Sequence, residues 1–425
     1  MRRVLTVILV SLLLVSVVLT GCSAPAEKKE QAAEEPKPDK FTLGILLPLT
    51  GTFAAVAKTQ EQGALVAAED VNRAGGLSMP WGKVRVIPLT MDDQANLDIG
   101  VRRFEYLRDA GANAVVGQTW APLALAINEK TRQNPVLYFP VCVTPVESLK
   151  KGTLSPTTWV TAYTPWSVGY MAASAAINEL GKKRIFFLAR SDSWGWDIGA
   201  GVKAAAEKYG AEIVGTDEVP LGTTDFLAVL KKVRAAKPDV FISAQFGADA
   251  IALLKQAYDQ GLYKEMTIFN AFITNVVAQG LPPGALEGLY AMHFYYWDLT
   301  GFPDQEVAKA SVEYTERFKE QWGTPPDAYA TIAYIATRQI LDAVQAAGTF
   351  DPVKVAEYIQ QNPEFSTVKG PAKWREDHSP IYKYAAFLVK GKAASEKKHE
   401  WDLFTVVSAQ GGESVLPPLE MLGYK

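Results

Sequence analysis

The sequence predicts an α/β protein of two lobes, each built on a doubly wound parallel sheet. Short apolar runs alternate with stretches whose apolar residues recur at helical spacing, which is the pattern of β-α-β units. The alternation pauses at Thr158–Thr161 and starts again at Lys183. With 425 residues, of which 48% are hydrophobic, the chain is long enough to bury more than one core.

The stretch Phe41–Gly76 contains the first strand, loop and helix of this pattern. Thr42–Leu47 is a short apolar run, as expected for a strand buried on both faces of a sheet. The helical spacing that follows stops at Gly75-Gly76, because glycine tolerates the left-handed conformation common after a helix. Ligands bind beyond the carboxyl ends of strands in such sheets, so the loop Pro48–Phe53 is the first candidate site.

The N-terminal residues predict export and a lipid anchor. Arg2-Arg3 and the apolar run Val4–Leu19 have the charged and hydrophobic parts of a secretory signal, and the run is shorter than the roughly 20 residues that span a bilayer. Leu19-Thr20-Gly21-Cys22 resembles the bacterial lipoprotein processing motif, in which the cysteine becomes the acylated N-terminus. We therefore expect a signal peptide at residues 1–21 and a lipid on Cys22.

Residues 22–40 are rich in Glu, Lys, Ala and Pro and are expected to form a disordered, lipid-anchored tether. The protein should then be exported and held at the outer face of the cell membrane, on its periplasmic or extracellular side. With Cys22 acylated, Cys142 has no second cysteine for an intramolecular disulfide.

Further strands and helices follow along the chain. The predicted strands are Val84–Met91, Ala114–Val116, Pro135–Phe139, Lys183–Ala189, Asp239–Ser243, Ile268–Ile273, Gly288–Met292 and Tyr382–Val389. Two long helices, Pro303–Trp322 and Ala328–Ala346, are separated by Thr324-Pro325-Pro326, because a residue before proline is disfavoured in a helix.

Composition and motifs argue against several classes of protein. The net charge is −3 and the lysines and arginines are dispersed, so no nucleic-acid surface is expected. No G-x-S-x-G nucleophile turn and no G-x-x-x-x-G-K-[ST] phosphate loop occurs. His293, His378 and His399 are too scattered to suggest a metal set or a general base. We expect no enzyme activity, no cofactor and no metal.

Several spaced segments carry a resemblance to a known family over residues 41 to 410. They are Phe41–Gly76, Asp92-Asp93-Gln94, Ser191-Asp192-Ser193-Trp194-Gly195, Gly222-Thr223-Thr224-Asp225-Phe226 and Thr367–Trp374. In this order they resemble the type I periplasmic binding proteins, in particular the branched-chain amino acid-binding group, which delivers solutes to ABC importers. The resemblance implies two lobes joined by a three-strand hinge, a small-molecule ligand in the cleft, and ABC permease and ATPase subunits as partners. A monomer is expected.

The resemblance also implies where the lobes divide. Lobe 1 is expected in residues 41–161 and 292–375, and lobe 2 in residues 162–291 and 376–425. The three crossing strands are expected near Thr158–Tyr163, Tyr290–His293 and Trp374–Ser379.

Twelve candidate ligand-binding residues follow from the same resemblance. They are Thr50, Phe53, Thr119, Trp120, Ala121, Cys142, Val143, Thr144, Trp194, Phe246, Asn270 and Ala271. In the family, hydroxyl groups on the loops after the third and fourth strands hold the ligand's carboxylate. Trp120-Ala121 and Cys142-Val143 stand there in this chain, with Thr119 and Thr144 one residue away. The acid that binds the ammonium group in the family falls at Ala271.

These departures predict the kind of ligand. A charged group left unpaired in a closed cleft costs several kcal/mol, so a zwitterionic amino acid is disfavoured. We expect a ligand of amino-acid size that is less polar or non-zwitterionic, either aromatic or an amide. The alternatives are an ordinary branched-chain amino acid receptor and a ligand-sensing domain of the same fold. A sensor would continue into a membrane span, and the last part of the sequence has no apolar run of that length.

Overall fold

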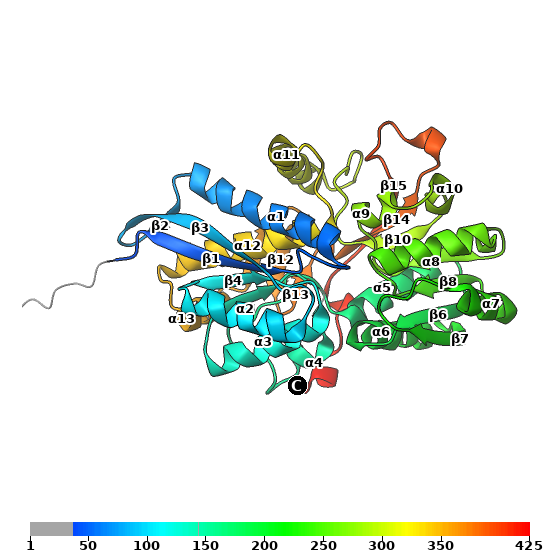
Figure 1. Ribbon diagram of the computed structural model, residues 1–425, viewed down its shortest axis with the longest axis horizontal. Helices are drawn as coiled ribbons and strands as arrows, with labels where there is room; N and C mark the ends of the chain where they lie inside the picture. Colours follow the sequence, from blue (N-terminus) through cyan, green and yellow to red (C-terminus); the bar gives the residue numbers. More distant parts are fainter. Residues whose placement is uncertain (1–36, 143) are drawn as a thin grey trace, which may run out of the picture. The chain divides into compact units, whose positions relative to one another are not determined.

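The computed structural model describes residues 37–142 and 144–425. The predictions for the signal peptide, for Cys22 and for most of the tether lie outside these residues, as does Val143. Residues Pro38–Lys425 form one compact unit. This unit contains two main sheets flanked by helices, which form the two lobes in Figure 1.

The first sheet has five strands in the order β2-β3-β1-β4-β5. Strands β3, β1, β4 and β5 pair in parallel, and β2 is antiparallel to β3. The strands are β1 (Lys40–Leu47), β2 (Leu77–Met79), β3 (Gly82–Asp92), β4 (Ala114–Gly117) and β5 (Leu137–Pro140). The helices of this lobe are α1 (Ala54–Arg73), α2 (Leu97–Asp109), α3 (Ala121–Gln133), α4 (Val146–Leu149), α11 (Gln305–Trp322), α12 (Ala328–Ala347) and α13 (Pro352–Gln361). Helix α12 packs along α1, so the first lobe combines early and late parts of the chain (Figure 1).

The second sheet has seven strands in the order β15-β14-β10-β9-β8-β6-β7. Strands β7, β6, β8, β9 and β10 are parallel, and β14 and β15 extend the sheet as antiparallel strands. The strands are β6 (Arg184–Arg190), β7 (Glu212–Val219), β8 (Val240–Ser243), β9 (Thr267–Asn270), β10 (Tyr290–His293), β14 (Ala386–Gly391) and β15 (Phe404–Gln410). The helices are α5 (Pro165–Asn178), α6 (Ser193–Tyr209), α7 (Leu227–Ala236), α8 (Ala248–Asp259), α9 (Asn275–Gln279) and α10 (Pro283–Leu286).

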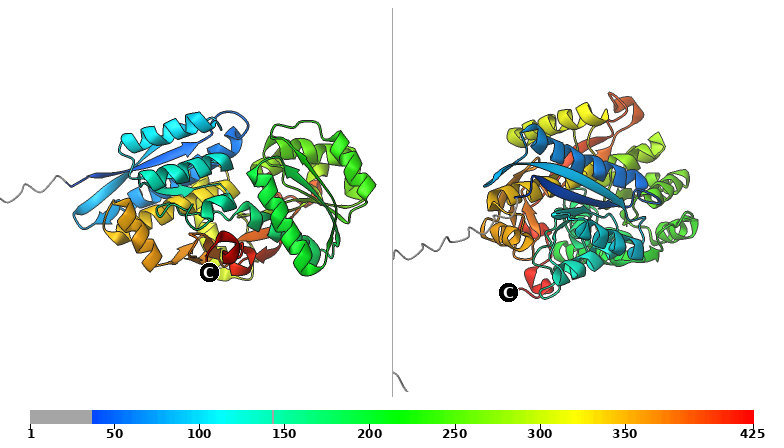
Figure 2. Two further views of the ribbon diagram at one scale, coloured as in Figure 1. Left: turned by 90° about the horizontal axis from the view of Figure 1, so that it is seen from below. Right: turned by 60° about the vertical axis from the view of Figure 1, so that its left-hand side comes forward.

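Three connections join the two lobes. They lie between α4 and α5, between β10 and α11, and between β13 (Pro380–Tyr382) and β14. Strand β13 belongs to a small antiparallel sheet with β11 (Glu364–Thr367) and β12 (Gly370–Trp374). Figure 2 shows these late elements, coloured orange to red, beside the boundary between the lobes. The chain thus has the α/β fold with two parallel-dominated sheets that the sequence predicts.

Buried side chains tie the three connections to one another. The hydroxyl group of Tyr382 donates to the carbonyl oxygen of Thr161 at 2.5 Å, which joins the third connection to the first. Lys369, with none of its surface exposed, donates through Nζ to the carbonyl oxygens of Phe294 at 3.3 Å and Ala385 at 2.8 Å. Burial holds the pKa of Lys369 well below its usual value. We call these five residues the hinge cluster.

The structure corrects three of the predicted boundaries. Tyr290–His293 is strand β10 inside the second sheet, because it pairs with β9 and β14, and the crossing follows it. The predicted strand Tyr382–Val389 is divided between β13 and β14 by the third connection. Lys40, expected in the tether, is the first residue of β1 and pairs with Arg85. The residues at which the lobes divide stay a prediction.

Among the elements that were not predicted, three have a clear physical reason. Strands β7 and β15 are the two edges of the second sheet and have few buried residues, so neither forms an apolar run in the sequence. Helix α5 is buried on nearly all sides, so it shows no apolar stripe. Over residues 37–142 and 144–425, none of the helices has the length and apolar character that crossing a bilayer requires.

Helices α5 and α6 approach closely because each has a glycine at the contact. A Cβ atom on Gly201 of α6 would lie 2.0 Å from the carbonyl oxygen of Trp166, and one on Gly169 of α5 would lie 2.0 Å from that of Ile198. Real contacts of this kind are never so short, and the clashing atoms belong to backbone that cannot rotate away. The pair therefore fixes the distance between the two helices.

Substituting Gly201→Ala should lower the free energy of unfolding by about 1–3 kcal/mol or more, because the added methyl forces the helices apart. The measurement is the midpoint of denaturant unfolding followed by circular dichroism. Ala200→Ser, on the exposed side of the same helix, is the control and should change stability by about 0.5 kcal/mol or less. An unchanged midpoint for Gly201→Ala would contradict the close packing.

Candidate functional site

The carboxyl ends of four strands face one another between the lobes. In each sheet the strand order changes direction between two neighbouring strands, β1 and β4 in the first sheet and β6 and β8 in the second. A doubly wound sheet leaves a crevice at such a point, because the connections from the two strands go to opposite faces. The loops after these four strands are therefore the natural walls of a site.

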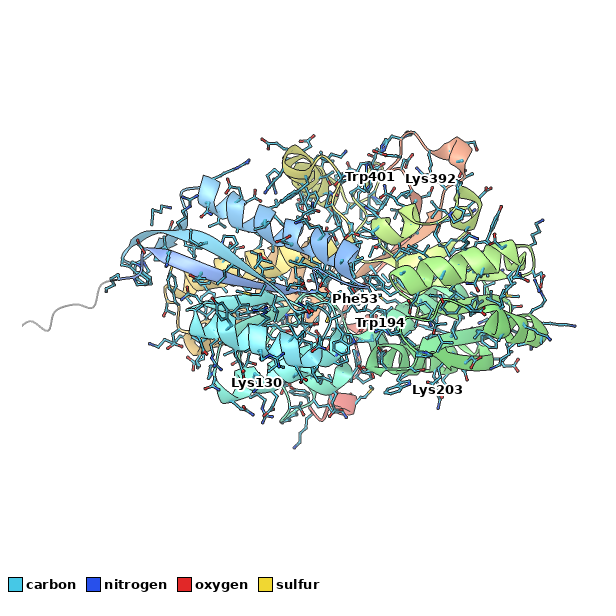
Figure 3. The ribbon with its side chains drawn as sticks, in the orientation of Figure 1. Phe53, Lys130, Trp194, Lys203, Lys392 and Trp401 are labelled. Atoms are coloured by element: carbon cyan, nitrogen blue, oxygen red, sulfur yellow. The ribbon has the colours of Figure 1, made fainter. Side chains whose placement is uncertain are left out.

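These loops enclose a cavity that we call the interlobe cavity. Its lining residues are Phe53, Thr119, Ala121, Arg190, Trp194, Phe246 and Tyr329. All but Tyr329 lie at or just after the ends of β1, β4, β6 and β8. Its volume is only about 10 Å³, room for about one water molecule and far below the roughly 300–1,000 Å³ of small-molecule pockets, so the walls would have to separate to admit a ligand. Figure 3 shows Phe53 and Trp194, one from each lobe, close together where the lobes meet.

Aromatic rings form most of the wall. The ring centroid of Phe246 lies 6.3 Å from that of Trp194 and 5.3 Å from that of Tyr329. Phe272 supports them from behind, at 6.0 Å from Phe246 and 5.5 Å from Tyr329. The indole nitrogen of Trp194 donates to the carbonyl oxygen of Ala244 at 2.6 Å. The N–H of this indole is therefore already hydrogen-bonded, and Trp194 can contact a ligand through the apolar face of its ring.

Arg190, the last residue of β6, is the charged side chain among the lining residues. It is 4% exposed, and its Nε donates to Oδ2 of Asp192 at 2.8 Å. Its guanidinium carbon lies 5.7 Å from the ring centroid of Trp194. Asp192 caps α6 with its other oxygen, which accepts from the amide of Gly195 at 3.2 Å. In the part of the chain that the structure describes, neither Nη atom of Arg190 has a hydrogen-bond acceptor.

The first lobe contributes a hydroxyl group and the start of a helix. The hydroxyl of Thr119 donates to Oε1 of Gln60, whose Nε2 donates to the carbonyl oxygen of Val141 at 2.7 Å. The hydrogen of Thr119 is therefore committed, and its oxygen can only accept a hydrogen bond from a ligand. Ala121 is the first residue of α3, at the end of the helix that carries a positive partial charge. Pro122 has no N–H and the amides of Leu123 and Ala124 donate to the carbonyl oxygen of Trp120, so the amide of Ala121 is the one available in the first turn.

Cys142 lies behind this wall, and its Sγ accepts from Nε2 of Gln118 at 3.0 Å. Burial raises the pKa of the Cys142 thiol to about 12. Gln118 itself has a positive φ of 60° and a fully buried side chain. Its backbone N–H donates to the carbonyl oxygen of Leu46. This contact fixes the loop after β4 to the end of β1.

The predicted site residues divide into two groups in the structure. Those that line the interlobe cavity are Phe53, Thr119, Ala121, Trp194 and Phe246. Of the others, Thr50 is exposed and donates to Oδ2 of Asp92 at 2.8 Å. Trp120 is partly buried against the core and does not line the cavity.

The remaining predicted residues lie at the end of β9 or just after β5 and β9, one strand further from the crevice. Cys142, Thr144, Asn270 and Ala271 are all buried and none lines the cavity. The amide nitrogen of Asn270 donates to the carbonyl oxygen of Gln245 at 3.0 Å, so this side chain holds the loop after β8. Their roles as ligand-binding residues stay predictions.

Two lining residues, Arg190 and Tyr329, were not predicted from the sequence. Arg190 could have been found, because a charged residue at the carboxyl end of an otherwise apolar strand lies where ligands bind. Tyr329 lies in the first turn of α12, far along the chain, and no local pattern marks it. Within residues 37–142 and 144–425, no group of three or more His, Cys, Asp or Glu side chains could hold a metal ion.

Comparisons with known proteins agree with this architecture. A model of the periplasmic binding protein family matches residues 40–395. The Leu/Ile/Val-binding protein homolog 1 of Brucella abortus is 24% identical over 338 residues, which are 80% of this chain and 87% of that protein.

Solved structures share the fold. The amino acid ABC transporter substrate-binding protein from Pseudomonas fluorescens Pf-5 superimposes with a TM-score of 0.80 at 24% identity, over 92% of this chain and 99% of that one. A solute-binding protein of an ABC transporter from R. palustris, in complex with benzoate, gives a TM-score of 0.74 at 17% identity, over 88% and 97% of the two chains. The chain therefore belongs to the periplasmic binding protein family, whose members bind solutes and are not enzymes, and it has the type I fold.

Proposed function

We propose that this protein captures a small aromatic or amide ligand that is not a zwitterion and delivers it to an ABC permease. The observation that carries the proposal is the interlobe cavity, which is lined by aromatic rings and by no carboxylate among the described residues. A ligand that touches both lobes binds their closed arrangement better than the open one, so capture proceeds by closure.

The lining argues against an amino acid because its ammonium group would lack a partner. The residue at the family's acidic position is Ala271, which is fully buried and does not line the cavity. Asp192 is the carboxylate that accepts a hydrogen bond from the lining residue Arg190, and its other oxygen accepts from the amide of Gly195. Both oxygens of Asp192 are therefore already in use. A buried ammonium group without a carboxylate to balance its charge would cost several kcal/mol.

Two comparisons bear on the ligand in opposite directions. The R. palustris protein holds benzoate, which supports the view that this fold can enclose an aromatic ligand. The Brucella abortus relative is named for leucine, isoleucine and valine. Ordinary branched-chain amino acid binding is therefore the second candidate.

We also propose that the protein is a lipoprotein. Family membership implies export, and the sequence around Cys22 carries the proposal, although it lies outside the described residues. The described chain begins at Lys37, and β1 starts at Lys40, so the segment between Cys22 and the first sheet is long enough to keep the binding lobes away from the membrane.

The ligand class is tested by calorimetry on protein that has been unfolded, stripped of ligand and refolded. Aromatic acids and amides should bind, whereas leucine and valine should bind weakly or not at all, because no carboxylate lines the cavity to balance the charge of their ammonium group. Binding of leucine or valine with a Kd of about 1 μM or tighter would return the protein to branched-chain amino acid uptake.

Trp194→Ala should weaken binding of an aromatic ligand by about 1–3 kcal/mol, because it removes a buried ring from the cavity wall. The measurement is the Kd by calorimetry. Trp196→Ala is the matched control, since Trp196 lies on the same helix but is 57% exposed and bonded to Glu218. Equal affinities for the two variants would show that Trp194 is only a core residue.

Cys22→Ala should move the protein from the membrane fraction to the soluble fraction while the ligand Kd stays unchanged, because only the anchor is lost. Fractionation of cells followed by immunoblotting measures this. A Ser23→Ala variant, which keeps the cysteine, serves as the control and should stay with the membrane. Persistent membrane association of Cys22→Ala would rule out the lipid anchor at this residue.

A further inference from the structure

The interlobe cavity contains a buried cation whose hydrogen-bonding capacity is mostly unused. Arg190 is 4% exposed, and only its Nε has an acceptor, Oδ2 of Asp192 at 2.8 Å. A guanidinium group has five N–H donors, so the four on the two Nη atoms find no acceptor in the described chain. Neither Nη atom is among the fully buried atoms that lack a partner, so both keep some accessible surface and are open to an acceptor on a ligand.

On this basis, and resting on the proposed function, we propose that Arg190 binds a carboxylate of the ligand from the second lobe. A carboxylate accepts two parallel N–H bonds from one guanidinium group, which would satisfy the donors left over by Asp192. The proposal narrows the ligand class to aromatic carboxylates.

Neighbouring carboxylates do not already fill this role. Asp192 uses one oxygen for Arg190 Nε and the other for the amide of Gly195. Asp249 is buried nearby, and its Oδ2 accepts from the amide of Gly222 at 2.8 Å, but no hydrogen bond joins it to Arg190. Burial raises the pKa of Asp249, while the amide of Gly222 and the charge of Arg190 act in the opposite direction.

The opposite wall has the complementary polarity. Because the hydrogen of Thr119 is committed to Gln60, this hydroxyl cannot donate to a carboxylate. It can accept from a hydroxyl or amide group of the ligand. The amide of Ala121 can donate to the same group, whereas Pro122 has no N–H and the amides of Leu123 and Ala124 already donate to the carbonyl oxygen of Trp120. A ligand would then lie with its carboxylate toward the second lobe and a neutral polar group toward the first.

The aromatic rings lie between these two polar ends. Trp194 packs beneath the guanidinium group of Arg190, with its ring centroid 5.7 Å from the guanidinium carbon, and Phe246 and Tyr329 continue the apolar wall. The cavity thus presents a guanidinium group at one end, aromatic rings in the middle, and a hydroxyl acceptor with a backbone amide at the other end. An aromatic acid such as a hydroxybenzoate carries complementary groups in the same order.

The test measures binding of benzoate, 4-hydroxybenzoate and benzamide to ligand-stripped full-length protein by calorimetry. The wild-type protein should prefer the two acids to benzamide. Arg190→Gln should weaken binding of the acids by about 10- to 100-fold, since hydrogen bonds to charged groups are the strong ones, and should change benzamide binding by less than about threefold. Arg190→Lys, which keeps the charge but not the planar fork, should lie between.

Arg184→Gln is the matched control. Arg184 is at the other end of β6, is exposed, and is bonded to Glu212 at 2.9 Å, so this change should leave binding of all three probes unaltered. Thermal unfolding establishes that each variant is folded. If Arg190→Gln is not folded, the comparison of Arg190→Lys with the wild type decides, and a loss of acid binding of at least about threefold is then required.

The possible results separate the two proposals. Acids that bind Arg190→Gln as tightly as the wild type, or a wild type that binds benzamide as tightly as benzoate, would overturn the role of Arg190 and leave the aromatic ligand class intact. Failure of all three probes to bind the wild type would overturn both the role of Arg190 and the aromatic ligand class. Tight leucine binding beside that failure would identify the amino acid receptor instead.

Discussion

The buried amine of Lys369 is the contact on which the relation between the lobes depends. It lies where two of the three connections pass, donates to a carbonyl oxygen in each, and lies 3.3 Å from the ring centroid of Phe294 and 4.2 Å from that of Tyr382. Because none of its surface is exposed, pulling the connections apart would leave an amine and two carbonyl groups buried without partners. Motion of the lobes is therefore expected to bend the connections around an intact hinge cluster rather than to break it.

This constraint explains why the site lies at the strand ends that face one another. The connections hold the sheets so that the switch point of one, at β1 and β4, opposes the switch point of the other, at β6 and β8. Each lobe supplies different chemistry: the first a hydroxyl acceptor and a helix start, the second a cation and aromatic rings. Neither lobe alone lines the interlobe cavity, so a ligand held there would contact both lobes.

Much of this could be predicted from the sequence, and the exceptions have physical causes. The resemblance to the family led to Phe53, Thr119, Trp194 and Phe246, and these side chains line the interlobe cavity, while their contact with a ligand stays a prediction. The loops after β5 and β9 look the same locally but lie one strand further out, a distance that only the sheet order reveals. Tyr329 reaches the cavity through the packing of α12 along α1, which no short pattern encodes. Edge strands and the fully buried helix α5 lack the apolar periodicity on which sequence prediction depends.

The environment of Cys142 has a consequence for the chemical durability of the protein. Disulfide exchange and oxidation proceed through the thiolate, and a pKa of about 12 leaves only a trace of thiolate at neutral pH. The sulfur is also buried and accepts a hydrogen bond from Gln118, which keeps oxidants and other thiols away from it. A receptor exported into an oxidising compartment can therefore keep a cysteine directly behind its binding wall without forming mixed disulfides there, and the wall should keep its shape throughout the working life of the protein.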